Sequence, residues 1–159
     1  MSDCFLKINT VTGEATDEGH KDEIDVLRWG WSVQNTSSVR YGTGSGSGKA
    51  TISDLRFDHH VDRASPILFK YAASGEHIDE AVLTVRKAGG KNGPVEYLKI
   101  TMKNVFVTHV SQSGGGSDAH ESVTLSFSDF TQSYKQQDDK GAGKAAVDSG
   151  YNFQENKLH

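Results

Sequence analysis

Hydrophobic and polar positions alternate along most of the chain, a pattern that indicates β-strands with one face on a core. The clearest case is residues 24–33, where four large apolar side chains occupy every second position: Leu27, Trp29, Trp31 and Val33. The positions between them carry small or charged groups: Arg28, Gly30 and Ser32. We expect the first set to fill the core and the second set to face away from it.

Further strands are predicted over residues 78–87, 95–110 and 122–134, with shorter ones at 5–8 and 151–153. Leu83 and Val85 share the core-facing parity of the first of these, and Leu125 and Phe127 share that of the third. We therefore predict that these four side chains complete the core.

Three long strands change parity midway: between Ile52 and Leu55, between Met102 and Val105, and between Phe127 and Phe130. A β-bulge absorbs such a one-residue slip and bends the strand. Repeated bends favour a curled or closed sheet. The predicted fold class is mainly β, a compact β-barrel of two curled sheets.

One short helix is expected outside the barrel. Ser65 suits its N-cap, Pro66 its first turn and Gly75 the position just past its end. The polar, glycine-containing segments 34–48, 111–119 and 136–144 are predicted to be loops or tail, and the first is long enough to serve a function.

Length and composition limit the number of domains and the classes of protein to which the chain can belong. The chain has 159 residues and one expected domain spanning 1–159, with 35% hydrophobic residues and a net charge of -4. Scattered Lys and Arg argue against a nucleic-acid surface, and no apolar run is long enough for membrane insertion. The N-terminus lacks the features of a cleaved signal, so we expect synthesis in the cytoplasm and any export to use another route.

Candidate chemistry is sparse. The glycine-rich run 42–50 fails the phosphate-loop pattern, because Thr43 and Ala50 stand where Gly and Ser or Thr are needed. His59 and His60 are adjacent on a strand and point to opposite faces, so we expect surface or partly packed histidines and no metal site. His20, His77, His109 and His120 are scattered and are given no role. No catalytic residue and no cofactor site is predicted.

Trp29 and Trp31 allow two interpretations. Core packing is favoured by the alternation, and a stacking platform for bases is the alternative. The absence of interleaved Lys or Arg on that face weakens the alternative.

The order of several motifs resembles the hemolysin-coregulated protein (Hcp) family of bacterial type VI secretion. The matching runs are residues 5–8, 13–17, 20–27, 29–31 (WGW), 61–66 (VDRASP), 74–77, 86–90, 96–98, 111–115 and 134–138. They cover nearly the whole chain. Tyr151 departs from the pattern, because the family usually has another aromatic residue there, often Trp.

The resemblance implies a compact barrel whose copies form a homohexameric ring with a wide channel. Rings stack into the inner tube that a contracting sheath expels, and small effectors can travel in the channel. The implied partners are further copies of the chain and the spike, sheath and effector proteins. The implied location is the cytoplasm before firing and the exterior afterwards.

Residue roles follow from the same resemblance. The strand that carries Arg28, Gly30 and Ser32 borders the channel, so these three residues are expected to contact effectors. An extended loop contacts the next ring, and its residues here are Arg40, Tyr41, Gly42, Thr43, Gly44, Ser45, Gly46, Ser47 and Gly48. Two alternatives remain: a ring that is primarily an effector-binding chaperone or export receptor, and a solitary hydrolase or carbohydrate-binding barrel.

Overall fold

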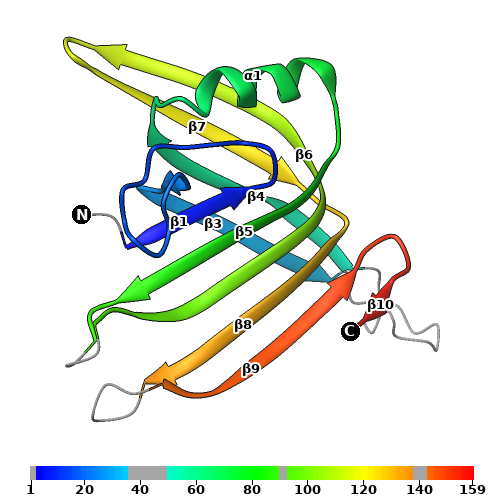
Figure 1. Cartoon of the computed structure of the whole chain (residues 1–159). Coiled ribbons are helices and arrows are strands. Elements are labelled where there is room, and N and C mark those ends of the chain that lie inside the picture. Colours follow the sequence, from blue (N-terminus) through cyan, green and yellow to red (C-terminus); the bar gives the residue numbers. More distant parts are fainter. Residues whose placement is uncertain (1–2, 36–49, 90–92, 138–142) are drawn as a thin grey trace.

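The computed structural model of the chain describes residues 3–35, 50–89, 93–137 and 143–159 (Figure 1). Strands dominate this part of the chain, with one short helix, so the predicted mainly-β fold is confirmed. The elements are β1 (Cys4–Ile8), β2 (Ile24–Asp25), β3 (Arg28–Asn35), β4 (Ala50–His60), α1 (Ser65–Ser74), β5 (Ile78–Lys87), β6 (Val95–Gly115), β7 (Asp118–Ser126), β8 (Asp129–Gln137), β9 (Gly143–Asn152) and β10 (Lys157–Leu158).

The long strand β6 belongs to both halves of the sheet. Its first half lies between β5 and β8, and its second half pairs with β7. One path of paired strands runs β10-β9-β8-β6-β5-β1-β2, and a branch leaves β6 through β7 and β4 to β3. Figure 1 shows β8 and β9 continuing the sheet on one side of β6 while α1 crosses above its other end.

The strands that the structure describes do not close into a barrel, which corrects that part of the predicted fold class. The circuit ends at β2 on one side and at β3 on the other. These two strands are consecutive in the chain and are joined by Val26 and Leu27. The Val26 amide donates to the Cys4 carbonyl at 2.9 Å, and the Leu27 amide donates to the Asp58 carbonyl at 2.8 Å. A covalent link with single hydrogen bonds therefore spans the gap in place of a strand ladder.

The predicted changes of parity have different structural causes. In β4, the register shifts between the pairs Gly30–Arg56 and Ser32–Ser53. Two residues of β4 there lie opposite the single residue Trp31 of β3, as in a β-bulge. In β6, Asn104 has a φ of 52° between the two halves of the strand. The predicted strand 122–134 is instead two strands, β7 and β8, separated at Phe127 and Ser128. Strand β7 pairs with β4 and β6, whereas β8 pairs with β6 and β9. The alternation of apolar and polar residues in β8 is therefore independent of that in β7.

Helix α1 ends as predicted but begins differently. Gly75 adopts a φ of 69° and its amide donates to the Tyr71 carbonyl, a left-handed C-terminal cap. Ser65 is not the N-cap, which is Ala64 and makes no side-chain cap. The Ser65 hydroxyl instead accepts a hydrogen bond from the Asp62 amide at 3.1 Å. The Asp62 carboxylate accepts one from the Ala64 amide at 2.8 Å, which organises the turn before the helix.

The segment 111–119, expected to be a loop, is the end of β6 and the start of β7. The two strands form an exposed hairpin arm, residues 111–120, whose turn contains Gly116 at a φ of 64°. Gln34 and Asn35 complete β3, and the remainder of the predicted loop 34–48 lies outside the described residues. The predicted tail 136–144 contributes the end of β8 and the start of β9 around an undescribed segment.

The apolar core lies inside the curl of the sheet. Leu83, Val85, Leu125 and Phe127 are buried in it. Leu27 and Val33, expected to join them, are 48% and 49% exposed, so that prediction was wrong for the single chain. The reason is position: Leu27 lies in the link between β2 and β3, and Val33 lies where β3 has passed beyond the core. Among the described residues no helix has the length and apolarity to cross a bilayer.

Candidate functional site

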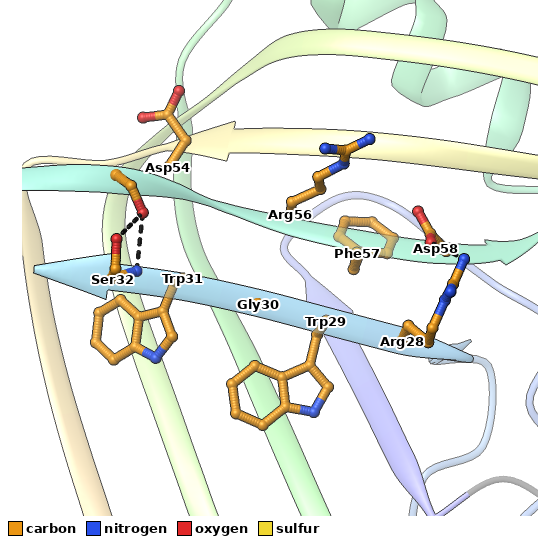
Figure 2. Close-up of a pocket in the computed structure, with 10 residues that line it drawn as sticks. Arg28, Trp29, Gly30, Trp31, Ser32, Asp54, Arg56, Phe57 and Asp58 are labelled. Atoms are coloured by element: carbon orange, nitrogen blue, oxygen red, sulfur yellow. Dashed lines mark hydrogen bonds and ion pairs between the residues drawn. The ribbon is translucent and has the colours of Figure 1, made fainter.

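The two faces of β3 differ sharply in character (Figure 2). Arg28, Gly30 and Ser32 are exposed, whereas Trp29 and Trp31 are half-buried and pack against the core. The Trp31 ring meets Phe130 edge-on with centroids 5.0 Å apart. Packing therefore holds the indoles on the core side and leaves the polar face of β3 open to a partner.

A surface hollow of about 460 Å³ follows β3 and the neighbouring part of β4. The Arg28 guanidinium donates to the Asp58 carboxylate across the two strands at 3.1 Å. Arg28 is 83% exposed, so this ion pair contributes little to stability and leaves the cation accessible. Figure 2 shows Arg56 and Asp54 from β4 on the same side. The hollow thus presents charges of both signs suited to polar contacts with a protein.

Ser32 and Ser53 fix the far end of this hollow. The amide and the hydroxyl of Ser32 each donate to the Ser53 hydroxyl oxygen at 2.8 Å, next to the bulge of β4. Within the residues that line the hollow, these hydroxyls are bonded to each other and have no histidine beside them. The arrangement supplies hydrogen bonds and lacks the paired base that an activated nucleophile needs.

Gly30 lies in the middle of the open face. A Cβ added at Gly30 would meet no atom within 4 Å. Packing in this chain therefore does not require glycine there, and the space in front of it is free for a ligand or a partner.

A buried polar cluster lies elsewhere, between β4 and β7. His59, predicted to be on the surface or partly packed, is 1% exposed, so that prediction was wrong. Its Nε2 lies 2.7 Å from Oε1 of the buried Glu121, whose Oε2 accepts a hydrogen bond from Gln112 at 2.7 Å. Burial alone lowers the pKa of His59, but the carboxylates of Asp62 and Glu121 outweigh it and raise the pKa overall.

A second buried histidine was also missed by the sequence analysis. His20 stacks on Phe5 with centroids 4.5 Å apart. Its two ring nitrogens lie 3.0 Å from the Glu23 carboxylate and 2.7 Å from that of Glu96. These contacts hold the segment between β1 and β2 against β6, a structural role. Local sequence offered only the His20/Glu23 spacing, because Glu96 is distant in the chain.

Large apolar side chains remain on the surface of the described residues. They are Leu27, Val33, Val61, Ile67, Phe69, Phe106, Tyr134, Val147 and Leu158. Within the ranges that the structure describes, β3 pairs only with β4, and the outer edge of β9 is occupied only near its end, by β10. Unpaired strand edges and apolar groups together are typical of surfaces that associate with other chains.

The predicted ring-stacking residues, Arg40 to Gly48, lie outside the described residues. Arg28, Gly30 and Ser32 are brought together on one exposed face, which is compatible with contact to a passing molecule.

Comparisons with known proteins agree in sequence and in fold. A family model described as "Type VI secretion system effector, Hcp" matches residues 5–134. The chain is 42% identical over 157 residues to protein hcp1 of Pseudomonas aeruginosa, covering 97% of this chain and 96% of that one. It resembles the crystal structure of Hcp1 from Salmonella typhimurium, with a TM-score of 0.81, 42% identity and complete coverage of both chains. A type VI secretion system effector from Yersinia pestis gives a TM-score of 0.77 and 34% identity, over 94% of this chain and 99% of that one.

Proposed function

Because the chain belongs to the Hcp family of type VI secretion proteins, which are not enzymes, we propose that it is a subunit of the secreted inner tube. Six copies form a ring around a central channel, and rings stack into the tube. The observation that carries this proposal is full-length similarity to Hcp proteins in both sequence and structure.

The surface of the single chain supports assembly into a ring. A ring with cyclic symmetry repeats one heterologous interface, so each chain needs two different complementary surfaces. One candidate is the edge of β3, which carries the exposed Val33. The other is the outer edge of β9, which carries the exposed Val147. The two lie on opposite branches of the sheet, as a repeating interface requires.

The polar face of β3 is proposed to line the channel. Arg28, Gly30 and Ser32 would then contact effectors during transit. A wall of mixed charge and small side chains offers weak, reversible contacts to varied cargo, whereas a strongly apolar wall would retain it.

The glycine-rich segment Arg40 to Gly48 is proposed to contact the next ring. Arg and Tyr often supply interface energy, so Arg40 and Tyr41 are the proposed anchors. Ordering a glycine-rich segment is costly, and stacking would therefore depend on six weak contacts acting together.

The implied partners are the spike, the sheath and the effectors. We propose that the protein resides in the cytoplasm before firing and outside the cell afterwards. A secretion assay tests this proposal in cells with and without a functional contractile sheath, with effector abundance measured in the same cells. Release that requires the sheath supports a tube subunit, and release that is independent of it contradicts one. Sheath-independent release together with loss of effectors in cells lacking the protein would favour the effector-carrier alternative.

A further inference from the structure

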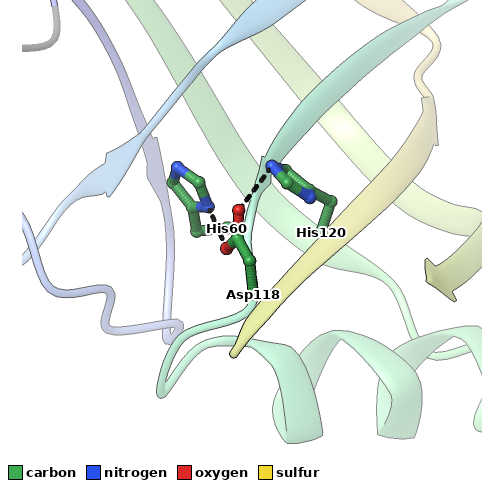
Figure 3. A group of neighbouring side chains, drawn as sticks. All are labelled: His60, Asp118 and His120. Carbon is green, nitrogen blue, oxygen red and sulfur yellow. Dashed lines mark ion pairs between the residues drawn. The ribbon is translucent and has the colours of Figure 1, made fainter. Parts of the chain in front are cut away.

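We infer that His60, Asp118 and His120 form a binding site for a divalent transition-metal cation, with Zn²⁺ the best match to these ligands (Figure 3). The site lies on the same face of the sheet as Arg28, and His120 lines a surface hollow together with Arg28 and Asp58. Sequence reasoning did not group the three residues, because His60 is far from the other two along the chain.

The strands themselves bring the three side chains to one face. His60 at the end of β4 is the direct cross-strand partner of His120 on β7. Asp118 precedes His120 by two residues on β7, so both point to the same side. The Val61 amide donates to the Ala119 carbonyl at 3.0 Å, which extends the backbone pairing past the site. The ligands are therefore placed by regular paired backbone.

The distances between ligand atoms suit one ion. His60 Nδ1 lies 3.3 Å from Asp118 Oδ1, and His120 Nε2 lies 3.6 Å from Asp118 Oδ2. Candidate ligand atoms of all three residues lie within 4.8 Å of one another. Zn²⁺ bonds of about 2.0–2.1 Å in a tetrahedron place neighbouring ligand atoms about 3.3 Å apart. Small side-chain rotations therefore suffice to enclose the ion.

The donor set selects a class of metal. Two imidazoles and one carboxylate favour Zn²⁺ and its neighbours over Ca²⁺ or Mg²⁺, which prefer all-oxygen shells. The side chains of His60, His120 and Asp118 are 56%, 48% and 59% exposed, so water can reach the fourth position. His59 is not a ligand, because it points to the other face and contacts Glu121.

Metal binding would fasten the hairpin arm to the body of the protein. Asp118 and His120 lie in the exposed arm, residues 111–120, whereas His60 lies on β4 before the turn that leads to α1. A bound ion adds a cross-link between them and would slow opening of the arm.

Titration of the tag-free, metal-free full chain with ZnCl₂ by calorimetry tests the site, alongside hydrogen exchange of the arm amides. We expect one Zn²⁺ per chain and slower exchange in residues 111–120 when Zn²⁺ is present. The variants His120→Gln and Asp118→Asn should lose this binding. His77→Gln is the matched control, because His77 is exposed and has one carboxylate, that of Asp79, at 3.6 Å.

Metal binding by the site variants and by the control variant decides whether the site exists. Loss of binding in both site variants with retention in the His77→Gln control supports the site. Unchanged binding in His120→Gln or Asp118→Asn, or no binding by the native chain, overturns it. Circular dichroism checks that the variants fold, and His60→Gln replaces either variant that does not.

Discussion

His59 and Glu121 face each other across the β4–β7 ladder, with Nε2 and Oε1 2.7 Å apart and each residue only 1% exposed. Asp62 approaches the other ring nitrogen at 3.8 Å. A protonated His59 is therefore flanked by two carboxylates inside the protein, and their negative charges stabilise it. The pKa of His59 is raised because these carboxylates outweigh the effect of burial, which acts in the opposite direction.

This pair predicts a pH dependence of stability. In the unfolded chain, the pKa of a histidine is about 6.5. Because the folded-state pKa is higher, the stabilisation from protonated His59 is fully present below about pH 6.5 and is lost as pH rises through the folded-state pKa. Urea unfolding measured from about pH 6 to pH 9 should show this decline, and His59→Gln should flatten it, since Gln donates to Glu121 at any pH in this range.

The control for this prediction is His109→Gln, which changes an exposed histidine on β6. It should keep the native pH dependence. If His59→Gln retains the same decline as the native chain, protonation of His59 is not its source.

The alternation of apolar and polar residues was enough to predict most of the long strands. Strand β5 matches its predicted range of 78–87, although burial along it does not alternate strictly and its register with β6 shifts between Val85 and Arg86. The pattern could not distinguish a bulge from a strand break, so the turn at Ser128 was missed. Burial of His59 depends on Glu121 and Gln112, which only the folded chain brings near. Alternation likewise gave no sign that the core ends before Val33.

One part of the candidate site, the division of β3 into two faces, could be predicted from the sequence. The opposite faces of Trp29 and Gly30 follow from period two alone. The His60–His120 pairing did not, because it depends on the register between β4 and β7.

Leu83→Ala should destabilise the protein strongly. Leu83 lies on β5 with no exposed surface, so truncation leaves a cavity in the core. The expected loss in the free energy of unfolding is about 2–5 kcal/mol. Leu158→Ala is the matched control: this leucine is 77% exposed, and its loss should be within about 0.5 kcal/mol. Similar losses in the two variants would refute the described core.

Gly30→Asp should alter cargo handling and leave folding intact. An added Cβ meets no atom within 4 Å, so the expected change in unfolding free energy is about 0.5 kcal/mol or less. Gly115→Asp provides the control, since Gly115 is equally open but lies on the hairpin arm. Ring formation, thermal stability and effector abundance in cells are the readouts. Rings that fall apart in Gly30→Asp would show that β3 does not face an open channel.

Shortening the segment between Val39 and Lys49 should preserve the ring and abolish the tube. A polar, glycine-rich segment can bury little apolar surface, so its loss should cost the core little. A variant of native length with Arg40 and Tyr41 changed to Ser separates the anchors from the length. Light scattering, electron microscopy and a secretion assay report on rings, tubes and export. Loss of the hexamer, or unchanged tubes and secretion, would each contradict the proposed role.

The mass of the purified chain in solution tests the central claim most directly. Size-exclusion chromatography with light scattering at micromolar concentration should give six times the 17.3 kDa mass of the chain. That result is expected because the exposed apolar groups beside β3 and β9 need partners and one repeated interface closes a ring. A monomer or a dimer as the dominant species would contradict the proposed tube subunit.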